Sequence, residues 1–209
     1  MTYDFIGEHP NRDLNFLFPN EACIKDFDTG ELDTAKHPII FIINNYSNYN
    51  SLGFKLTSHP KPHPLNDFFY ITLSKDTDFE NSEKESSTIK CDHIIEFGEG
   101  YDNKNPQNHF RAKGNIKPNK YNQIMTEVIT RHILLQEQRL ATKDPSTELL
   151  LIELEIEKED IITSPLYQKL ETELFDKNKK LPAGQRNARL RAIEEQRTKV
   201  KNLEESKQI

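Results

Sequence analysis

The sequence predicts an α+β protein in which a small antiparallel β-barrel or sandwich, closed by a helix, precedes a helical extension. About five short segments with the pattern of strands fall within roughly the first hundred residues, with no helix between them. The first extended helical periodicity comes only at residues 120–140. We therefore expect a barrel domain over residues 1–143 and a charged helical extension over residues 144–209.

The strand predictions rest on alternation and on β-branched or aromatic content. Residues 38–43, Pro-Ile-Ile-Phe-Ile-Ile, read as a buried strand. In residues 53–57, Phe54 and Leu56 alternate with Lys55 and Thr57, which is the period of a half-buried strand. Further strands are expected at residues 14–18, 67–74 and 88–97, and a charged loop at residues 77–86.

Helices are expected wherever a cap precedes helical spacing. Residues 120–140 carry apolar side chains at that spacing, with Asn119 as the N-cap. New helices are expected after Asp144 and after Ser164, because each of these residues can act as an N-cap and is followed by a proline that suits the first helical position. A break at Pro182 precedes a last helix over residues 186–203, whose thin apolar stripe must pack on another surface.

Composition limits the class of protein. The chain has 209 residues, of which 34% are hydrophobic, so it can build one modest core. No apolar run approaches the roughly 20 residues that span a bilayer, and the first residues do not resemble a signal peptide, so we expect a cytoplasmic protein without membrane contact. The two cysteines, Cys23 and Cys91, are expected to be reduced thiols.

The net charge of −6 is unevenly distributed. Residues 145–175 carry 2 Lys/Arg against 8 Asp/Glu, whereas residues 176–209 carry 10 against 5. These segments could neutralise each other, or the basic end could bind an acidic partner. Solvated helix faces are the simplest interpretation.

A dense group of reactive side chains lies between residues 36 and 63. Its members are Lys36, His37, Thr57, Ser58, His59, Lys61 and His63. Histidines can act as general acid and base near neutral pH, and hydroxyl and ammonium groups can hold a phosphate. This chemistry suits RNA cleavage by attack of a ribose 2′-OH, which needs no metal.

Two other interpretations of this group remain open. His59 and His63, together with Asp92 and His93, could bind zinc. However, a spacing of four residues brings His59 and His63 together only on a helix, and the prolines in this segment forbid a helix. Alternatively, residues 60–64 form a stiff, solvated polyproline turn. His93 and His132 are expected to be structural.

The order of these segments resembles the PemK/MazF toxin endoribonucleases. The resemblance covers about residues 28–140: Lys-His-Pro before the apolar strand, Leu-Thr-Ser ending the next, and a helix after a turn at Gly114. It implies an SH3-like barrel. The segment at residues 56–63 is also similar to the Thr-Ser-Pro-Lys segment of type III toxin relatives, whose inhibitor is RNA.

The resemblance also implies roles for individual residues. His37 takes the place of the family's catalytic arginine, and Thr57 or Ser58 that of its catalytic hydroxyl. Arginine carries a permanent charge and several hydrogen-bond donors, whereas the charge of histidine depends on pH. Either His37 acts as an acid or base in a way that the family's arginine does not, or activity is lost. The side chains expected to bind substrate are Lys36, Lys55, Lys61, His59 and His63, with Lys90 adding positive charge.

The leading hypothesis is a toxin-like, metal-independent endoribonuclease that cleaves single-stranded RNA. We expect no metal and no cofactor; the expected partners are the RNA substrate and a protein or RNA antitoxin, and a homodimer is compatible with the sequence. The alternative is a non-catalytic SH3-like binding module with a helical partner-binding arm. A DNA-binding accessory protein is a third hypothesis.

Overall fold

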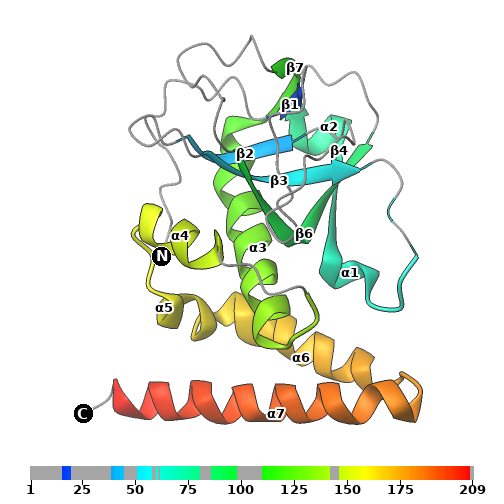
Figure 1. The fold of residues 1–209 in the computed structure, drawn as a ribbon, viewed down its shortest axis with the longest axis vertical. Helices are drawn as coiled ribbons and strands as arrows, with labels where there is room; N and C mark the ends of the chain where they lie inside the picture. Colours follow the sequence, from blue (N-terminus) through cyan, green and yellow to red (C-terminus); the bar gives the residue numbers. More distant parts are fainter. Residues whose placement is uncertain are drawn as a thin grey trace.

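The computed structural model describes residues 16–19, 39–44, 51–57, 60, 62–80, 86–97, 110–141 and 146–207. For β1, β2 and most of β7 only the backbone is described. The sheet lies at one end of the molecule, α3 runs beside it, and α6 and α7 cover the far end of α3 (Figure 1).

The described residues form one antiparallel sheet in the order β4-β6-β3-β2-β1-β7-β5. The strands are β1 Phe16–Pro19, β2 Ile39–Asn44, β3 Ser51–Thr57, β4 Tyr70–Ser74, β5 Phe79–Glu80, β6 Ser86–Phe97 and β7 Phe110–Ile116. The predictions of strands at residues 14–18, 38–43, 53–57 and 88–97 are confirmed to within a few residues. Strand β7, in the Gly114 segment, was not predicted.

The predicted barrel is wrong, and so is the SH3-like barrel that the resemblance implied. Among the described strands, β4 and β5 are the two edges, and they pair with β6 and β7 but not with each other. The short helix α2, Lys75–Asp78, joins the two edges where a charged loop was expected. The sheet is therefore open. Its closure could not be predicted from the sequence, because closure depends on strand tilt and stagger, which local alternation does not encode.

Helix α1, Asn66–Phe69, replaces the first half of the strand predicted at residues 67–74. Leu65 and Phe68 are both buried, and Phe68 N–H donates to the Leu65 carbonyl oxygen at 2.9 Å. This helical spacing puts both side chains into the core, and β4 starts only at Tyr70.

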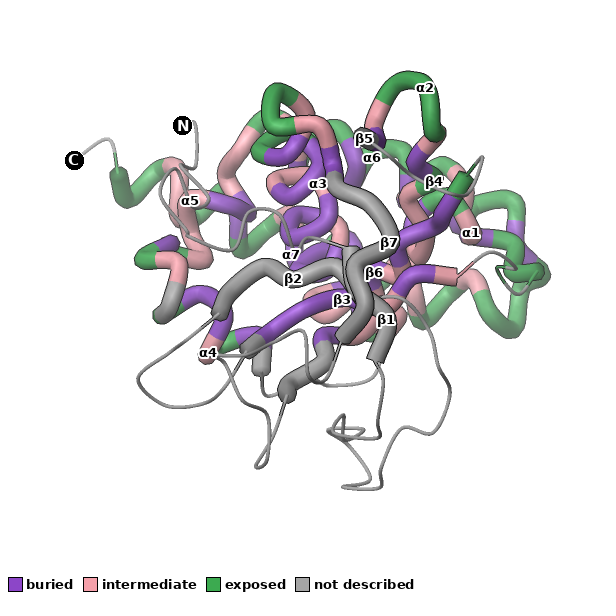
Figure 2. The backbone as a smooth tube through the Cα atoms, turned by 90° about the horizontal axis from the view of Figure 1, so that it is seen from above, coloured by how far each residue is buried: buried purple, intermediate pink, exposed green. Residues whose placement is uncertain are grey.

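Helix α3, Pro118–Glu137, confirms the helix predicted at residues 120–140. Its N-cap is Lys117 rather than Asn119, because Pro118 already occupies the first helical position. The helix packs on one face of the sheet, where the His132 ring meets Phe54 of β3 edge-on at 5.5 Å between ring centroids. Figure 2 shows buried residues along α3, β3 and β6, and a largely exposed α2.

The C-terminal region is helical, as predicted. Its helices are α4 Ser146–Glu153, α5 Lys158–Ile162, α6 Pro165–Lys179 and α7 Ala183–Ser206. Ser164 caps α6 as expected, since its hydroxyl accepts from Tyr167 N–H at 3.2 Å. The stripe of α7 is buried at Ile193 and Val200, and one apolar cluster runs from the sheet through α3 to these residues.

Across the described parts of the chain, no helix combines the length and apolar character that a membrane crossing requires.

Candidate functional site

Three threonines form a row across the neighbouring strands β3, β6 and β4. Thr57, the last residue of β3, lies opposite Thr88 of β6, which lies opposite Thr72 of β4. The hydroxyl oxygens of Thr72 and Thr88 are hydrogen-bonded at 3.3 Å. Residues directly opposite each other point to the same side of a sheet, so these hydroxyls share one face.

Two lysines lie on the same face as the threonines. Lys55 and Lys90 are each two residues from a member of the row, and side chains repeat with that period along a strand. Both are half-buried, and Lys90 Nζ lies 3.5 Å from the Asp92 carboxylate. We call Lys55, Thr57, Thr72, Thr88 and Lys90 the hydroxyl–lysine face.

The other side of these strands is apolar and turned towards α3. Leu56, Ile71 and Ile89 lie opposite one another in the ladder, and Leu56 and Ile89 are fully buried. Burial of these apolar side chains fixes the register of the strands, because a shift of the register by one residue would turn the threonine hydroxyls into the core.

The described strands bring together only part of the site predicted from sequence. Thr57 and Lys55 lie on the hydroxyl–lysine face, and Ile39, the first residue of β2, pairs with Lys55. Strand β2 therefore begins beside the end of β3. The remaining predicted residues before His63, which are Lys36, His37, Ser58, His59 and Lys61, lie outside the described residues.

His63 is exposed, and one of its two ring nitrogens already forms a hydrogen bond within the chain. Its Nδ1 accepts from Leu65 N–H at 3.0 Å, and the ring packs edge-on against Phe69 at 4.7 Å between centroids. Partial burial lowers the pKa of His63, and the positive charge of Arg189 lowers it further. Both effects favour the neutral ring. Because Nδ1 accepts a hydrogen bond, the proton of the neutral ring lies on Nε2, from which it can donate to a ligand.

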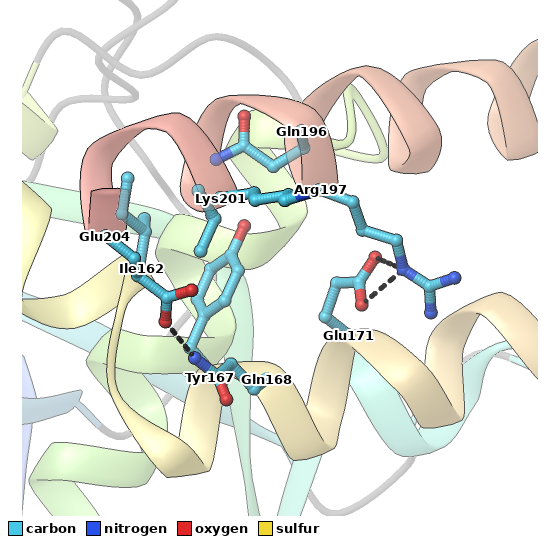
Figure 3. Close-up of a pocket in the computed structure, with 9 residues that line it drawn as sticks. Ile162, Tyr167, Gln168, Glu171, Gln196, Arg197, Lys201 and Glu204 are labelled. Carbon is cyan, nitrogen blue, oxygen red and sulfur yellow. Dashed lines mark hydrogen bonds and ion pairs between the residues drawn. The ribbon is translucent and has the colours of Figure 1, made fainter. Parts of the chain in front are cut away.

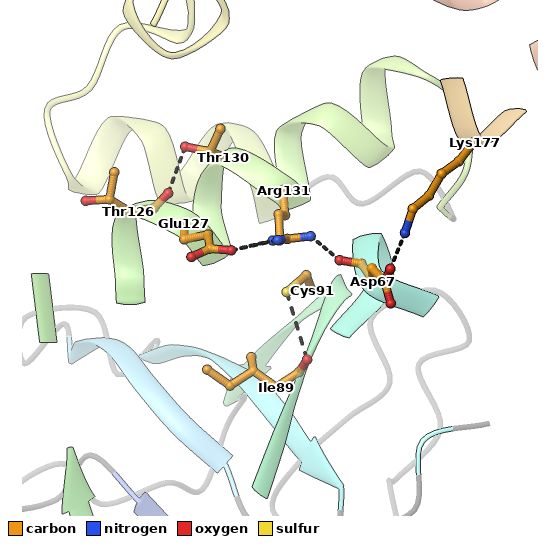
Figure 4. Close-up of polar contacts among 8 residues, drawn as sticks. All are labelled: Asp67, Ile89, Cys91, Thr126, Glu127, Thr130, Arg131 and Lys177. Atoms are coloured by element: carbon orange, nitrogen blue, oxygen red, sulfur yellow. Dashed lines mark hydrogen bonds and ion pairs between the residues drawn. The ribbon is translucent and has the colours of Figure 1, made fainter. Parts of the chain in front are cut away.

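The segment after His63 is anchored by α1 (Figure 4). Arg131 of α3 donates from Nε to Glu127 Oε1 at 2.9 Å and also donates to the Asp67 carbonyl oxygen. Lys177 of α6 forms an ion pair with the Asp67 carboxylate, and this hydrogen bond and charge lower the pKa of Asp67. Helix α1 is therefore held between α3 and α6.

The basic end of the chain approaches this segment. Lys180, Arg186 and Arg189 surround the turn between α6 and α7, and none of them forms an ion pair with another described residue. Arg189 is close enough to His63 to affect its pKa. Positive charge from the C-terminal helices thus reaches the neighbourhood of the predicted site.

Sequence reasoning missed Thr72 and Thr88. Both lie in hydroxyl-containing alternations, Tyr70-Ile-Thr-Leu-Ser and Ser86-Ser-Thr-Ile-Lys, which were interpreted only as strands. The alternation could have placed both on the side opposite the apolar row, where Thr72 is exposed and Thr88 is only 5% exposed. Only the pairing of β4 with β6 places them beside Thr57.

Hydroxyl and ammonium groups at this spacing can hold the oxygens of a phosphate. Within the described ranges, no group of three or more His, Cys, Asp or Glu side chains lies close enough together to hold a metal ion. The face thus offers hydrogen-bond donors and positive charge.

The chain is an α+β protein with an open antiparallel sheet that carries a polar outer face. Comparisons with family models, curated proteins and solved structures find no significant match. The functional argument therefore rests on the chemistry of this face.

Proposed function

We propose that the chain is a metal-independent endoribonuclease that binds single-stranded RNA on the hydroxyl–lysine face. The observation that supports this proposal is the row of Thr57, Thr88 and Thr72, flanked by Lys55 and Lys90. The ammonium groups would offset phosphate charge, which supplies much of the affinity for RNA.

The proposed reaction is attack of a ribose 2′-oxygen on the adjacent phosphorus. The 2′-O–P bond forms, the bond from phosphorus to the 5′-oxygen breaks, and the products are a 2′,3′-cyclic phosphate and a 5′-hydroxyl. The 2′-OH proton must leave and the 5′-oxygen must gain one, which is the work of a general base and a general acid.

Each residue has a proposed role in this reaction. Thr57 and Ser58 donate hydrogen bonds to the non-bridging oxygens, whose charge increases in the transition state. His37, two residues before β2, exchanges the protons, while His63 donates from Nε2 to the RNA. The remaining substrate contacts are assigned to Lys36, Lys61 and His59.

The resemblance to toxin endoribonucleases suggests the biological setting. In this proposal the chain is the toxin of a toxin–antitoxin pair, and a protein or RNA antitoxin inhibits it by covering the hydroxyl–lysine face.

Incubation of the full chain with labelled single-stranded RNA in a chelator tests the proposal. We expect fragments ending in cyclic phosphate, at least a hundredfold slower cleavage by Thr57→Ala and by His37→Ala, and substantial activity in Thr57→Ser. Thr198→Ala, an exposed change on α7, is the matched control. Absence of cleavage, or cleavage unaffected by both alanine variants, would refute the enzyme.

The alternative is a non-catalytic binding module that meets its partner through the C-terminal helices. It is favoured by one observation: Lys90 Nζ already lies 3.5 Å from the Asp92 carboxylate, so part of the positive charge of the hydroxyl–lysine face is balanced within the chain. RNA retained on a filter without cleavage, or no RNA binding together with partner capture by α6 and α7, would support it.

A further inference from the structure

A cavity of about 200 Å³ lies between α6 and α7, remote from the sheet (Figure 3). Ile162 and Val200 contribute its apolar wall, and Tyr167 of α6 extends towards Gln196 of α7. A cavity of about 150 Å³ can hold benzene, so this one is large enough for a six-membered ring with an attached oxygen.

Several polar atoms at this cavity are buried and have no hydrogen-bond partner among the described residues. They include the Tyr167 hydroxyl and Gln196 Nε2, on side chains whose residues are only 1% and 6% exposed. Gln138, at the end of α3 and 2% exposed, does not line the cavity, but both of its amide atoms are also buried without a partner among the described residues. More than about nine in ten buried polar groups in proteins have a partner, so this concentration points to a ligand.

The two groups that line the cavity are hydrogen-bond donors. Burial raises the pKa of Tyr167, with a further contribution from the Glu137 carboxylate, while the neighbouring amides of Gln138 and Gln196 oppose the shift. The phenol therefore keeps its proton. A ligand oxygen placed in the cavity can accept from both this O–H and the Gln196 N–H.

The charges at the mouth of the cavity are balanced. Arg197 Nε donates to both carboxylate oxygens of Glu171, at 2.8 and 2.9 Å. Gln168 Nε2 donates to Glu204 Oε1 at 2.8 Å, and Lys201 lies 3.8 Å from Glu205. The lining itself holds two cations, Arg197 and Lys201, and two carboxylates, Glu171 and Glu204, so it carries no net charge and favours an uncharged ligand.

We propose that this cavity binds a small, uncharged ring with an amide-type carbonyl, of the size of a pyrimidine base. The carbonyl oxygen accepts from the Tyr167 hydroxyl and from Gln196 Nε2, while the ring contacts Ile162 and Val200. This site is separate from the hydroxyl–lysine face and does not depend on the proposed nuclease activity.

Thermal unfolding of the full chain with uracil as the probe tests this site. At ten times its Kd, uracil should raise Tm by about 3–6 °C. Tyr167→Phe should remove this shift, yet unfold without uracil at an equal or higher Tm, because phenylalanine deletes an unpaired buried hydroxyl and keeps the ring. Gln196→Leu should also remove the shift, and Tyr70→Phe, on the sheet, should keep it.

The opposite results are equally clear. No shift with uracil, or a shift retained by both Tyr167→Phe and Gln196→Leu, overturns the proposal. An equal shift with toluene shows an apolar cavity without carbonyl recognition, and an equal shift with benzoate shows an anion site, and each outcome also overturns it. If Tyr167→Phe does not fold, Gln196→Leu alone decides.

Discussion

Thr147 of α4 donates its hydroxyl hydrogen to Nε2 of His132 on α3, at 2.8 Å. On the other side of the ring, Nδ1–H donates to the Cys91 carbonyl oxygen of β6, also at 2.8 Å. Since a carbonyl can only accept, this pair of bonds sets the tautomer. The fully buried imidazole therefore connects the sheet, α3 and the C-terminal region.

His132→Leu should lower the free energy of unfolding by about 2–4 kcal/mol, because it leaves a buried carbonyl and a buried hydroxyl unpaired. Thr147→Val should cost about 1–2 kcal/mol, and Thr147→Ser, which keeps the hydroxyl, should cost less. Chemical denaturation measures all three. A His132→Leu variant as stable as the parent would show that the two bonds contribute nothing.

Glu171 predicts a specific pH dependence of stability. Burial raises its pKa above the ordinary 4.5, and the hydrogen bond and charge of Arg197 only partly oppose this. A group whose pKa is raised in the folded state contributes its full stabilisation at pH values below its pKa in the unfolded chain. This contribution is lost as the pH rises through its pKa in the folded protein. The stability of the parent relative to Glu171→Gln should therefore increase as pH falls from 7 to below 4.5.

Arg197→Met provides a second test of the same carboxylate. It removes both effects that oppose the raised pKa of Glu171, the hydrogen bond and the charge of Arg197, and keeps a side chain that can pack on Phe175. The pH window should therefore move upward. Denaturation curves at several pH values measure both variants. A difference between parent and Glu171→Gln that stays constant across this range would contradict the prediction.

His63 should titrate below its ordinary value of 6.5 in the folded protein. A histidine whose pKa is lowered in the folded state contributes its stabilisation at pH values above its pKa in the unfolded chain. This contribution is lost as the pH falls through its pKa in the folded protein. Arg189→Gln should raise the pKa only in part, since burial is the larger cause. Histidine NMR titration measures the change, and Arg191→Gln is the control; an unchanged pKa in Arg189→Gln would refute the contact.

Lys90 should contribute to RNA affinity if the hydroxyl–lysine face binds phosphate. Lys90→Gln should reduce the slope of log affinity against log salt by about 0.7, the value for one phosphate contact on a single strand. Lys169→Gln, an exposed change on α6, should leave the slope unchanged. Filter binding at several salt concentrations decides, and equal slopes for parent and Lys90→Gln would place the RNA elsewhere.

Local patterns were sufficient to predict most elements of the fold. Alternation of Phe54 and Leu56 with Lys55 and Thr57 identified β3, and helical spacing identified α3 to within a few residues. The cap at Ser164 was also correct. These signals are local because side-chain period and capping depend on residues only a few positions apart.

The candidate site was predictable only in part. Thr57 and Lys55 were identified from sequence, but Thr72 and Thr88 join them through strand pairs that no local pattern specifies. The cavity around Tyr167 and Gln196 was not predicted at all, because these residues are 29 positions apart and meet only when α6 packs on α7.

The sequence by itself determined most of the strands and helices and which side of each is apolar, but it did not predict α1, α2 or β7. Only the tertiary structure decided that the sheet stays open, with α2 joining its edges, and that the thin stripe of α7 is buried against its neighbours. The physical reason is that element type follows from short-range backbone preferences. Sheet closure and helix docking depend on register and packing between distant residues.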